Sequence, residues 1–214
     1  MSKSIVLCYS PGACSLAPHI VLYELGVPFT ARRFATAERA NYGAEFLAIN
    51  PKARIPALII DGFTLTENPA ILTYLGRRFP EAKLYPANTG EAEARCLEWL
   101  AWLSNTVHIA VAQVFRPVRY AKDEKDHPPV VESGKEHVRQ SLAQIERHLA
   151  KNPFAVGSSL TVVDPCLLPY YRWGNRMKFD MRADYPSYTR FVEKLGDRPA
   201  VKKALEVEGI GLLG

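Results

Sequence analysis

The sequence has few cysteines, and none of them form a close pair. Cys8, Cys14, Cys96 and Cys166 are scattered along the 214 residues, with no Cys-x-x-Cys motif and no histidine at the spacing of zinc ligands. This pattern excludes a disulfide scaffold and gives no sign of a structural metal site. We therefore expect four free thiols and no bound metal.

Long hydrophobic runs are also absent. No apolar segment approaches the roughly 18 residues that a bilayer-spanning helix needs. The chain enters a short apolar run at residues 5–9 without the hydrophobic region and cleavage site of a signal peptide. These absences predict a cytoplasmic protein that does not associate with membranes.

Charge of one sign is not concentrated anywhere, although the formal net charge is +5 at pH 7. The longest charged stretch, residues 119–127, mixes both signs and is typical of a solvated loop. A nucleic-acid partner is therefore not expected. The mild positive balance suits a small anionic ligand.

The first 80 residues alternate between strand-like and helix-like segments. Apolar strands at residues 5–9 and 29–34 flank a helical pattern at residues 15–25, which predicts a βαβ-like opening. Residues 55–66 predict a hairpin, because a central Asp-Gly pair supplies the positive φ angles of a tight turn.

A helix is expected after this hairpin. Asn68 is its predicted N-cap, Pro69 its first helical residue, and it runs to about Arg78. Residues 81–90 then carry the turn-forming composition of an interdomain linker.

Beyond the linker the periodicity is purely helical. Apolar residues recur at helical spacing in residues 91–115 and 130–149. Thr161-Val-Val-Asp164 has the form of a capping box that opens a third helix, and a short final helix begins at Arg198.

These patterns together predict two domains. Residues 1–80 should form an α/β domain with a mixed four-stranded sheet and flanking helices. Residues 91–214 should form an all-α, helical-bundle domain.

Cys14 stands where the first strand gives way to the first helix. A Ser-Pro-Gly turn precedes it, so the cysteine falls at or near a helix N-terminus. Backbone amides and the helix dipole would lower its pKa there and favour a reactive thiolate. The alternative is an inert cysteine that fills space beneath the first helix.

Five motifs in order resemble the cytosolic glutathione transferase family, most closely its bacterial beta class. They cover the chain almost from end to end and comprise residues 9–21, 50–58, 65–75, 98–108 and 161–164. The resemblance implies that the first domain is thioredoxin-like and that glutathione is the co-substrate.

The resemblance also assigns residues to glutathione. Ile55, before a cis proline at Pro56, would pair with the cysteinyl backbone of the tripeptide. Glu67 would hold the γ-glutamyl ammonium group, and the N–H of Asn68 would hold the carboxylate. Taken alone, Glu67 could equally serve the helix dipole.

Cys14 and His108 are the catalytic candidates that the resemblance implies near the glutathione sulfur. His108 would approach from the helical domain, although a hydrogen-bonded structural histidine is the alternative. Tyr9 and Ser10 are reserve candidates, because other classes of this family activate the thiol with a hydroxyl near this point. Both could instead be turn residues.

The sequence departs from the family pattern at three places. Asn68-Pro69 stands after the acidic Glu67, where the family usually has a serine or glycine. Ala101 and Ile109 replace polar and basic residues of the beta class. Glutathione binding could therefore be weaker, directed to another thiol, or shifted toward Arg39 or Arg54.

The sequence is therefore interpreted as that of a homodimeric enzyme that conjugates glutathione to a small hydrophobic electrophile. The alternatives are a glutathione-dependent thiol-disulfide oxidoreductase or peroxidase that uses Cys14, and a non-catalytic glutathione-binding protein. Aromatic candidates for the wall of the electrophile cleft, which could also be core residues, are Phe115, Tyr170, Tyr171 and Trp173.

Overall fold

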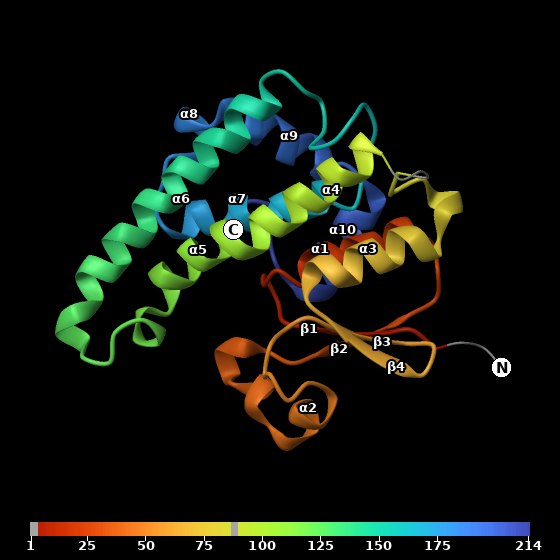
Figure 1. Ribbon diagram of the computed structural model, residues 1–214, viewed down its shortest axis with the longest axis horizontal. Coiled ribbons are helices and arrows are strands. Elements are labelled where there is room, and N and C mark those ends of the chain that lie inside the picture. Colours follow the sequence, from red (N-terminus) through yellow and green to blue (C-terminus); the bar gives the residue numbers. More distant parts are fainter. Residues whose placement is uncertain (1–3, 87–89) are drawn as a thin grey trace.

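A four-stranded mixed sheet forms the centre of the N-terminal half. The computed structural model describes residues 4–86 and 90–214 (Figure 1). The sheet order is β2-β1-β3-β4, in which β1 and β2 are parallel and the other pairs antiparallel. The strands are β1 (Val6–Tyr9), β2 (Thr30–Arg33), β3 (Ala57–Ile60) and β4 (Phe63–Thr66).

The hairpin between β3 and β4 turns where its sequence predicts. Asp61 and Gly62 have φ angles of 51° and 86°, in the left-handed region that a two-residue turn requires. The peptide bond between Ile55 and Pro56, just before β3, is cis. Both features confirm the expectations for this segment.

Helices cover both faces of the sheet. α1 (Leu16–Glu24) and α3 (Asn68–Arg78) lie on one face, and α2 (Ala44–Ile49) lies on the other (Figure 1). Phe46 of α2 is fully buried against Cys8 and joins a small second core. The short α2 was not predicted.

The helical half contains no strand among residues 90–214, as predicted. The helix expected at residues 91–115 is continuous but includes a π-helical turn, Leu103–Val107. The elements are α4 (Glu91–Trp102), α5 (His108–Phe115), α6 (His127–Leu149), α7 (Asp164–Arg176), α8 (Met181–Asp184), α9 (Pro186–Gly196) and α10 (Pro199–Glu208). α8 and α9 were not foreseen.

Two helix starts differ from the sequence interpretation. Asn68 is the first residue of α3 rather than its N-cap, and the cap position falls on Glu67 with a φ angle of 71°. The expected capping contacts do form between Thr161 and Asp164, whose Oδ2 accepts hydrogen bonds from Thr161 N at 2.6 Å and Oγ1 at 3.0 Å. The α-helix nevertheless begins only at Asp164.

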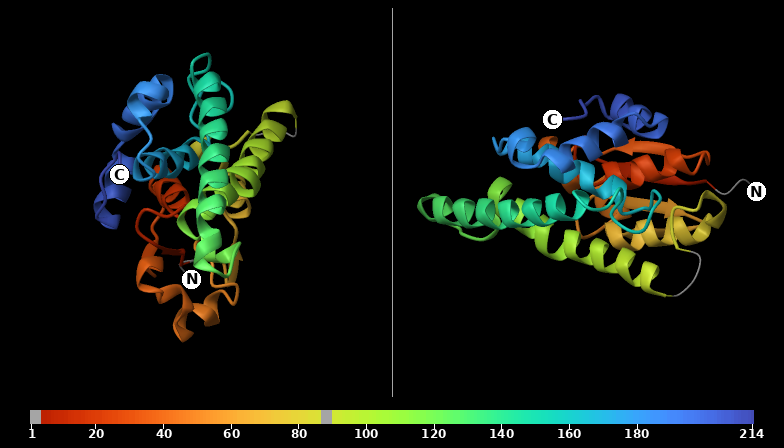
Figure 2. Two further views of the ribbon diagram at one scale, coloured as in Figure 1. Left: turned by 90° about the vertical axis from the view of Figure 1, so that its left-hand side faces the viewer. Right: turned by 90° about the horizontal axis from the view of Figure 1, so that it is seen from above.

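The two halves share one core. α1 packs on α7 and α10 as well as on the sheet, so apolar residues occur around most of its circumference (Figure 2). The predicted linker, residues 81–90, includes residues 87–89, which lie outside the described residues. Among the described residues, no helix is both long and apolar enough to cross a bilayer.

Candidate active site

Cys14 lies in the turn between β1 and α1, against the segment that enters β3. Its Sγ donates to the carbonyl oxygen of Ile55 at 3.6 Å. The side-chain Nδ2 of Asn68 donates to the carbonyl oxygen of Cys14 at 2.9 Å. The fold thus brings together three predicted site residues that come from three separate elements.

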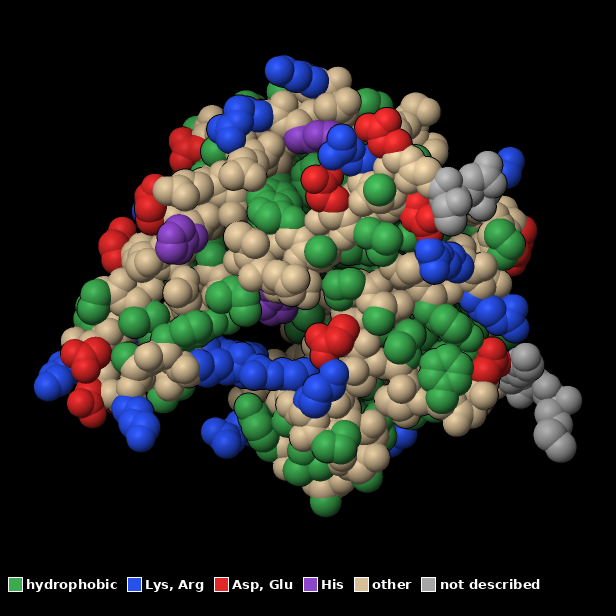
Figure 3. All heavy atoms as spheres, in the orientation of Figure 1, with side chains coloured by type: hydrophobic (Ala, Val, Ile, Leu, Met, Phe, Trp, Pro, Cys, Tyr) green, Lys and Arg blue, Asp and Glu red, His purple; other side chains and the backbone are tan. Residues whose placement is uncertain are grey.

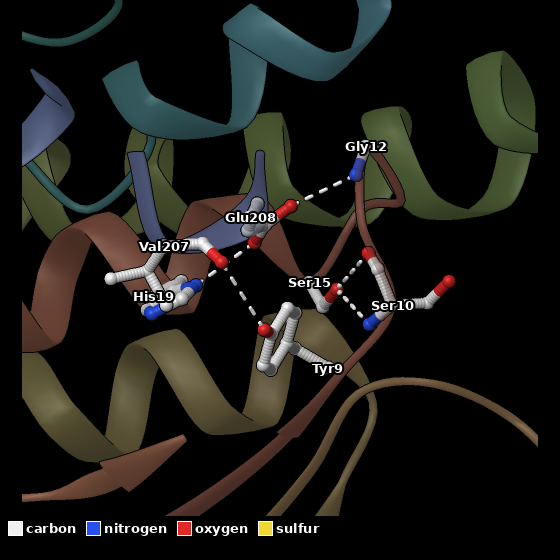
Figure 4. A network of polar contacts seen from close by, with 7 residues as sticks. All are labelled: Tyr9, Ser10, Gly12, Ser15, His19, Val207 and Glu208. Atoms are coloured by element: carbon white, nitrogen blue, oxygen red, sulfur yellow. Dashed lines mark hydrogen bonds and ion pairs between the residues drawn. The ribbon is translucent and has the colours of Figure 1, made fainter. Parts of the chain in front are cut away.

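The turn itself is held by Ser15. The Ser15 hydroxyl accepts from the Ser10 N–H at 3.1 Å and lies 3.2 Å from the Ser10 carbonyl oxygen (Figure 4). Ser15, rather than Cys14, occupies the N-cap position of α1. Cys14 is therefore one residue before the cap.

The predicted low pKa of Cys14 is wrong. Burial raises the pKa of its thiol to about 12, against the opposing effects of its own backbone amide and of Arg116. Desolvation of the thiolate outweighs the favourable amide and charge contributions at this position. Cys14 is still the only cysteine that is not fully buried, since Cys8, Cys96 and Cys166 lie inside the core.

His108 opens α5 directly after the π-helical turn. Its ring packs edge-on against Trp173, with centroids 5.3 Å apart, and lies 6.3 Å from Tyr170. Burial lowers its pKa to about 4, and the charges of Arg116, Arg119 and Arg54 act in the same direction. His108 is consequently a neutral imidazole near pH 7.

The aromatic candidates differ in exposure: Tyr170 and Trp173 are buried and hydrogen-bonded, whereas Phe115 is exposed. Trp173 Nε1 donates to the Gly12 carbonyl at 3.1 Å, and the Tyr170 hydroxyl donates to the Leu103 carbonyl at 2.7 Å. Phe115 is 38% exposed.

Tyr171 does not belong to a cleft wall. It is completely buried, and its hydroxyl lies 2.8 Å from Thr189 Oγ1. Tyr171 directly follows Tyr170 in the sequence, but consecutive residues of a helix point in different directions.

The hydroxyls of Tyr9 and Ser10 are engaged within the fold. Tyr9 donates to the Val207 carbonyl at 3.5 Å and points away from the turn (Figure 4). Ser10 Oγ accepts from the Thr36 N–H at 3.0 Å and is nearly inaccessible to solvent.

Glu67 stands at the edge of the same site in a strained backbone conformation. Its carboxylate pairs with Lys52 Nζ at 2.5 Å, and both side chains are more than half exposed. Non-glycine residues with positive φ cluster at binding sites. Arg39 and Arg54 are also exposed, and the Arg39 guanidinium lies over the Tyr42 ring at 5.0 Å.

A buried carboxylate supports the Cys14 turn from behind. Glu208 of α10 accepts from the Gly12 N–H at 2.8 Å through Oε2 and lies 2.9 Å from His19 Nδ1 through Oε1 (Figure 4). Both side chains of this pair are fully buried. Gly12 has a φ angle of 67°, which a residue with a Cβ adopts only at a cost.

Sequence reasoning missed Glu208. The residue follows Val207 near the end of an amphipathic helix, where an acidic side chain is ordinarily solvated. Only its contact with a turn 196 residues earlier distinguishes it. The described residues contain no group of three or more histidine, cysteine, aspartate or glutamate side chains that could hold a metal ion.

Family comparisons agree with this geometry. The model of the glutathione S-transferase N-terminal domain matches residues 6–77, and that of the C-terminal domain matches residues 107–199. Glutathione S-transferase GstA of Escherichia coli O157:H7 is 31% identical over 206 residues, which cover 95% of this chain and 98% of that protein. The chain belongs to the glutathione S-transferase family.

Solved structures show the same fold. A sphingomonad glutathione S-transferase complexed with glutathione is 37% identical, with a TM-score of 0.85 over 96% of this chain and all of that one. A beta-class enzyme from Sphingomonas chungbukensis is 34% identical, with a TM-score of 0.85 and the same coverage. The predicted fold and enzyme class, a glutathione transferase, are confirmed.

Proposed function

We propose that this glutathione transferase binds glutathione along Ile55, with the glutathione sulfur beside Cys14 and its γ-glutamyl end at Glu67 and Asn68. The observation that carries the proposal is the meeting of Cys14, Ile55 and Asn68 in one place. Backbone groups before a strand can pair with an extended peptide such as glutathione. Solved structures of two similar proteins, a sphingomonad glutathione S-transferase and a transferase homologue from Sulfitobacter, contain glutathione.

Asn68 supports this placement in a second way. Its buried Oδ1 has no hydrogen-bond partner among the described residues, although its Nδ2 is bonded to Cys14. A buried acceptor without a donor is unfavourable, so a ligand N–H or S–H would satisfy it. The exposed Arg54 and Arg39 are the basic groups proposed for a glutathione carboxylate.

The proposed chemistry is stabilisation of the glutathione thiolate without a charged cysteine. Cys14 remains a neutral thiol and can donate a weak hydrogen bond, while neutral His108 can donate from one ring nitrogen. The glutathione thiol gives its proton to solvent, and its sulfur then attacks the electrophile. The cleft wall would be formed by Phe115, Tyr170 and Trp173.

The raised pKa of Cys14 argues against the oxidoreductase alternative. The thiolate is the species that attacks a disulfide, and a thiol with a pKa of about 12 is almost entirely protonated at neutral pH. Conjugation requires no thiolate at Cys14. The conjugating role is therefore favoured over a redox role.

We also propose a homodimer formed through α3 and α4. An apolar groove of about 640 Å³ runs between these helices and β4, with Tyr74 and Leu97 in its lining. Phe63 and Leu97 are each more than 40% exposed, and hydrophobic side chains gather over β4 and α3 in the surface view (Figure 3). A second subunit would cover this surface, as the family resemblance implies.

The four free cysteines suit the reducing cytosol, where we place the enzyme.

Purified protein should be assayed with glutathione against aryl halides, disulfides and peroxides. Conjugation of aryl halides is the expected result. Glutathione binding without turnover of any compound would instead support a binding protein.

The proposed dimer has its own test. Leu97→Glu places a charge on the apolar surface of α4, so it should shift the sedimentation coefficient toward that of a monomer.

A further inference from the structure

Three arginines near the proposed site differ from most others on the surface. Arg32, Arg95 and Arg198, for example, each form an ion pair with a glutamate. Within the described parts of the chain, by contrast, Arg54, Arg116 and Arg119 form no ion pair with an acidic side chain. We call these three the cleft arginines.

The cleft arginines come from both sides of the site. Arg54 precedes Ile55 in the N-terminal half, whereas Arg116 and Arg119 follow α5 in the helical half. Basic side chains cross a hollow on the face shown in Figure 3, and a histidine lies at the inner edge of this hollow. The charges of Arg116, Arg119 and Arg54 all act on His108, so the three arginines lie near the space where the reacting groups are proposed to meet.

Electrostatic coupling agrees with this arrangement. The charge of Arg116 lowers the pKa of both Cys14 and His108, and Arg119 and Arg54 also act on His108. Burial lowers the pKa of Arg116 itself, and its two arginine neighbours lower it further. Like charges gathered without an acid repel one another, so an anion would stabilise the group.

The backbone that carries Arg116 and Arg119 is fixed. The 3₁₀ turn Pro117–Arg119 places the Arg119 N–H 3.0 Å from the Arg116 carbonyl, and the Tyr120 hydroxyl reaches back to the Ile109 carbonyl at 3.4 Å. The two arginines are thus carried by an ordered turn. A planar guanidinium matches a carboxylate, which it can bind through two parallel hydrogen bonds, better than a spherical ion.

Apolar surface adjoins the charge. Phe115 immediately precedes Arg116 and is 38% exposed, and the Arg176 guanidinium lies 5.1 Å from its ring centroid. Trp173 adds a second aromatic ring, which packs on the His108 ring. A ligand that fits here combines a flat apolar ring with an anionic end.

We propose that the electrophile of this transferase is an aromatic compound that carries a carboxylate, which Arg116 and Arg119 bind. The inference rests on the proposed conjugation of glutathione and names its substrate class. In the reaction, the glutathione sulfur forms a bond to the ring carbon that carries a halide. The carbon–halogen bond breaks, the halide leaves with the bonding electrons, and the thiol proton passes to solvent.

Two matched aryl halides test this proposal. 4-Chloro-3-nitrobenzoate and 4-chloro-3-nitrobenzamide have the same reacting carbon, but only the benzoate is charged. The measured quantity is the ratio of kcat/KM for the benzoate to that for the benzamide, each divided by its uncatalysed rate with glutathione. Arg116→Met and Arg119→Met should each lower this ratio about tenfold, since each removes a charge-assisted contact.

Two further variants make the comparison specific. Arg147→Met removes the same charge from an exposed position on α6 and should leave the ratio unchanged. Arg116→Lys keeps the charge and should recover part of the loss. A ratio that stays within about twofold in both methionine variants would overturn the proposal.

The glutathione carboxylate is a competing source of the anion. If Arg116 and Arg119 bind it, the methionine variants raise the KM for glutathione equally with both halides, and the proposal is wrong. If no halide is conjugated, the proposed conjugating function is wrong. The carboxylate preference of Arg116 and Arg119 is then tested by ligand binding alone. Calorimetry with S-methylglutathione present should then show 4-nitrobenzoate binding more tightly than 4-nitrobenzamide, and Arg116→Met should remove this preference; equal binding to the native protein overturns it.

Discussion

The two walls of the proposed active site present different kinds of atoms. The sheet wall, formed by Cys14, Ile55 and Asn68, offers mainly backbone carbonyls, an amide and an uncharged thiol. The helical wall, formed by His108, Arg116 and Arg119, offers side chains and positive charge. Backbone recognition survives most substitutions, whereas a single replacement can remove a charge. The contrast suits a peptide bound in the same way throughout a family and a second substrate that changes.

The largest effect is expected when the sheet wall loses its buried support. Glu208→Ala removes the partner of the Gly12 N–H and of His19, two groups that burial keeps from water. The free energy of unfolding should fall by about 3–5 kcal/mol, as when one member of a buried pair is removed. Urea unfolding followed by circular dichroism measures this change.

Glu206→Ala is the matched control on the same helix. Glu206 is exposed and pairs with Lys203 at the surface, so its loss should cost no more than about 1 kcal/mol. Equal destabilisation by the two variants would show that the buried contacts of Glu208 add no more to the free energy of unfolding than the surface ion pair of Glu206.

A second comparison concerns the charge state of the sheet wall. Because the pKa of Cys14 is about 12, its thiolate fraction should rise about tenfold for each pH unit through the alkaline range. Alkylation by iodoacetamide, followed by mass spectrometry, should therefore accelerate about 1000-fold from pH 7 to pH 10 without a plateau. An alkylation rate that reaches a plateau near neutral pH would instead show that Cys14 has a lowered pKa and is already a thiolate there. The Cys14→Ser variant gives the background from the three buried cysteines.

The edge of the sheet wall should respond more moderately. Glu67→Ala should weaken glutathione binding by about 1–3 kcal/mol, because a charged hydrogen-bond partner of the ligand is lost. Isothermal calorimetry measures the affinity. Glu45→Ala, which removes an exposed glutamate from the same half, should have no effect on glutathione. Unchanged affinity in the Glu67 variant would remove this residue from the proposed site.

The smallest effect is expected from Cys14→Ser. Serine keeps a small hydrogen-bond donor at this position, so conjugation by the variant should stay within about threefold of the native rate. A loss of conjugation by two orders of magnitude or more would assign Cys14 a direct role in activating the thiol.

Local chemistry made much of the fold predictable from the sequence. The turn at Asp61-Gly62 and the helical periodicity of residues 130–149 both depend on neighbouring residues alone, and both are present. The six-residue α2 has too few turns for a periodic signal, and it forms because Phe46 packs beneath the sheet. The cis bond at Pro56 followed only from the family resemblance, because proline by itself favours the trans form.

Burial limited what the sequence could say about the site. Sequence placed Cys14 near a helix start, but its pKa depends on how much protein surrounds the sulfur. Tyr171 shares a helix with Tyr170 and Trp173, which are 5% and 7% exposed, whereas packing leaves Tyr171 with no exposed surface. These properties arise from contacts between segments that are distant in the chain.

The contact between Gly12 and Glu208 has a consequence for the order of folding during synthesis. The N-terminal domain of a growing chain generally folds first. Here the turn that carries Cys14 acquires its last buried hydrogen-bond acceptor from a residue made 196 positions later. The β1–α1 turn therefore reaches its final hydrogen-bonded form only after α10 has been translated and has packed against α1. A nascent chain that already contains every strand of the sheet still lacks the finished turn of the proposed active site.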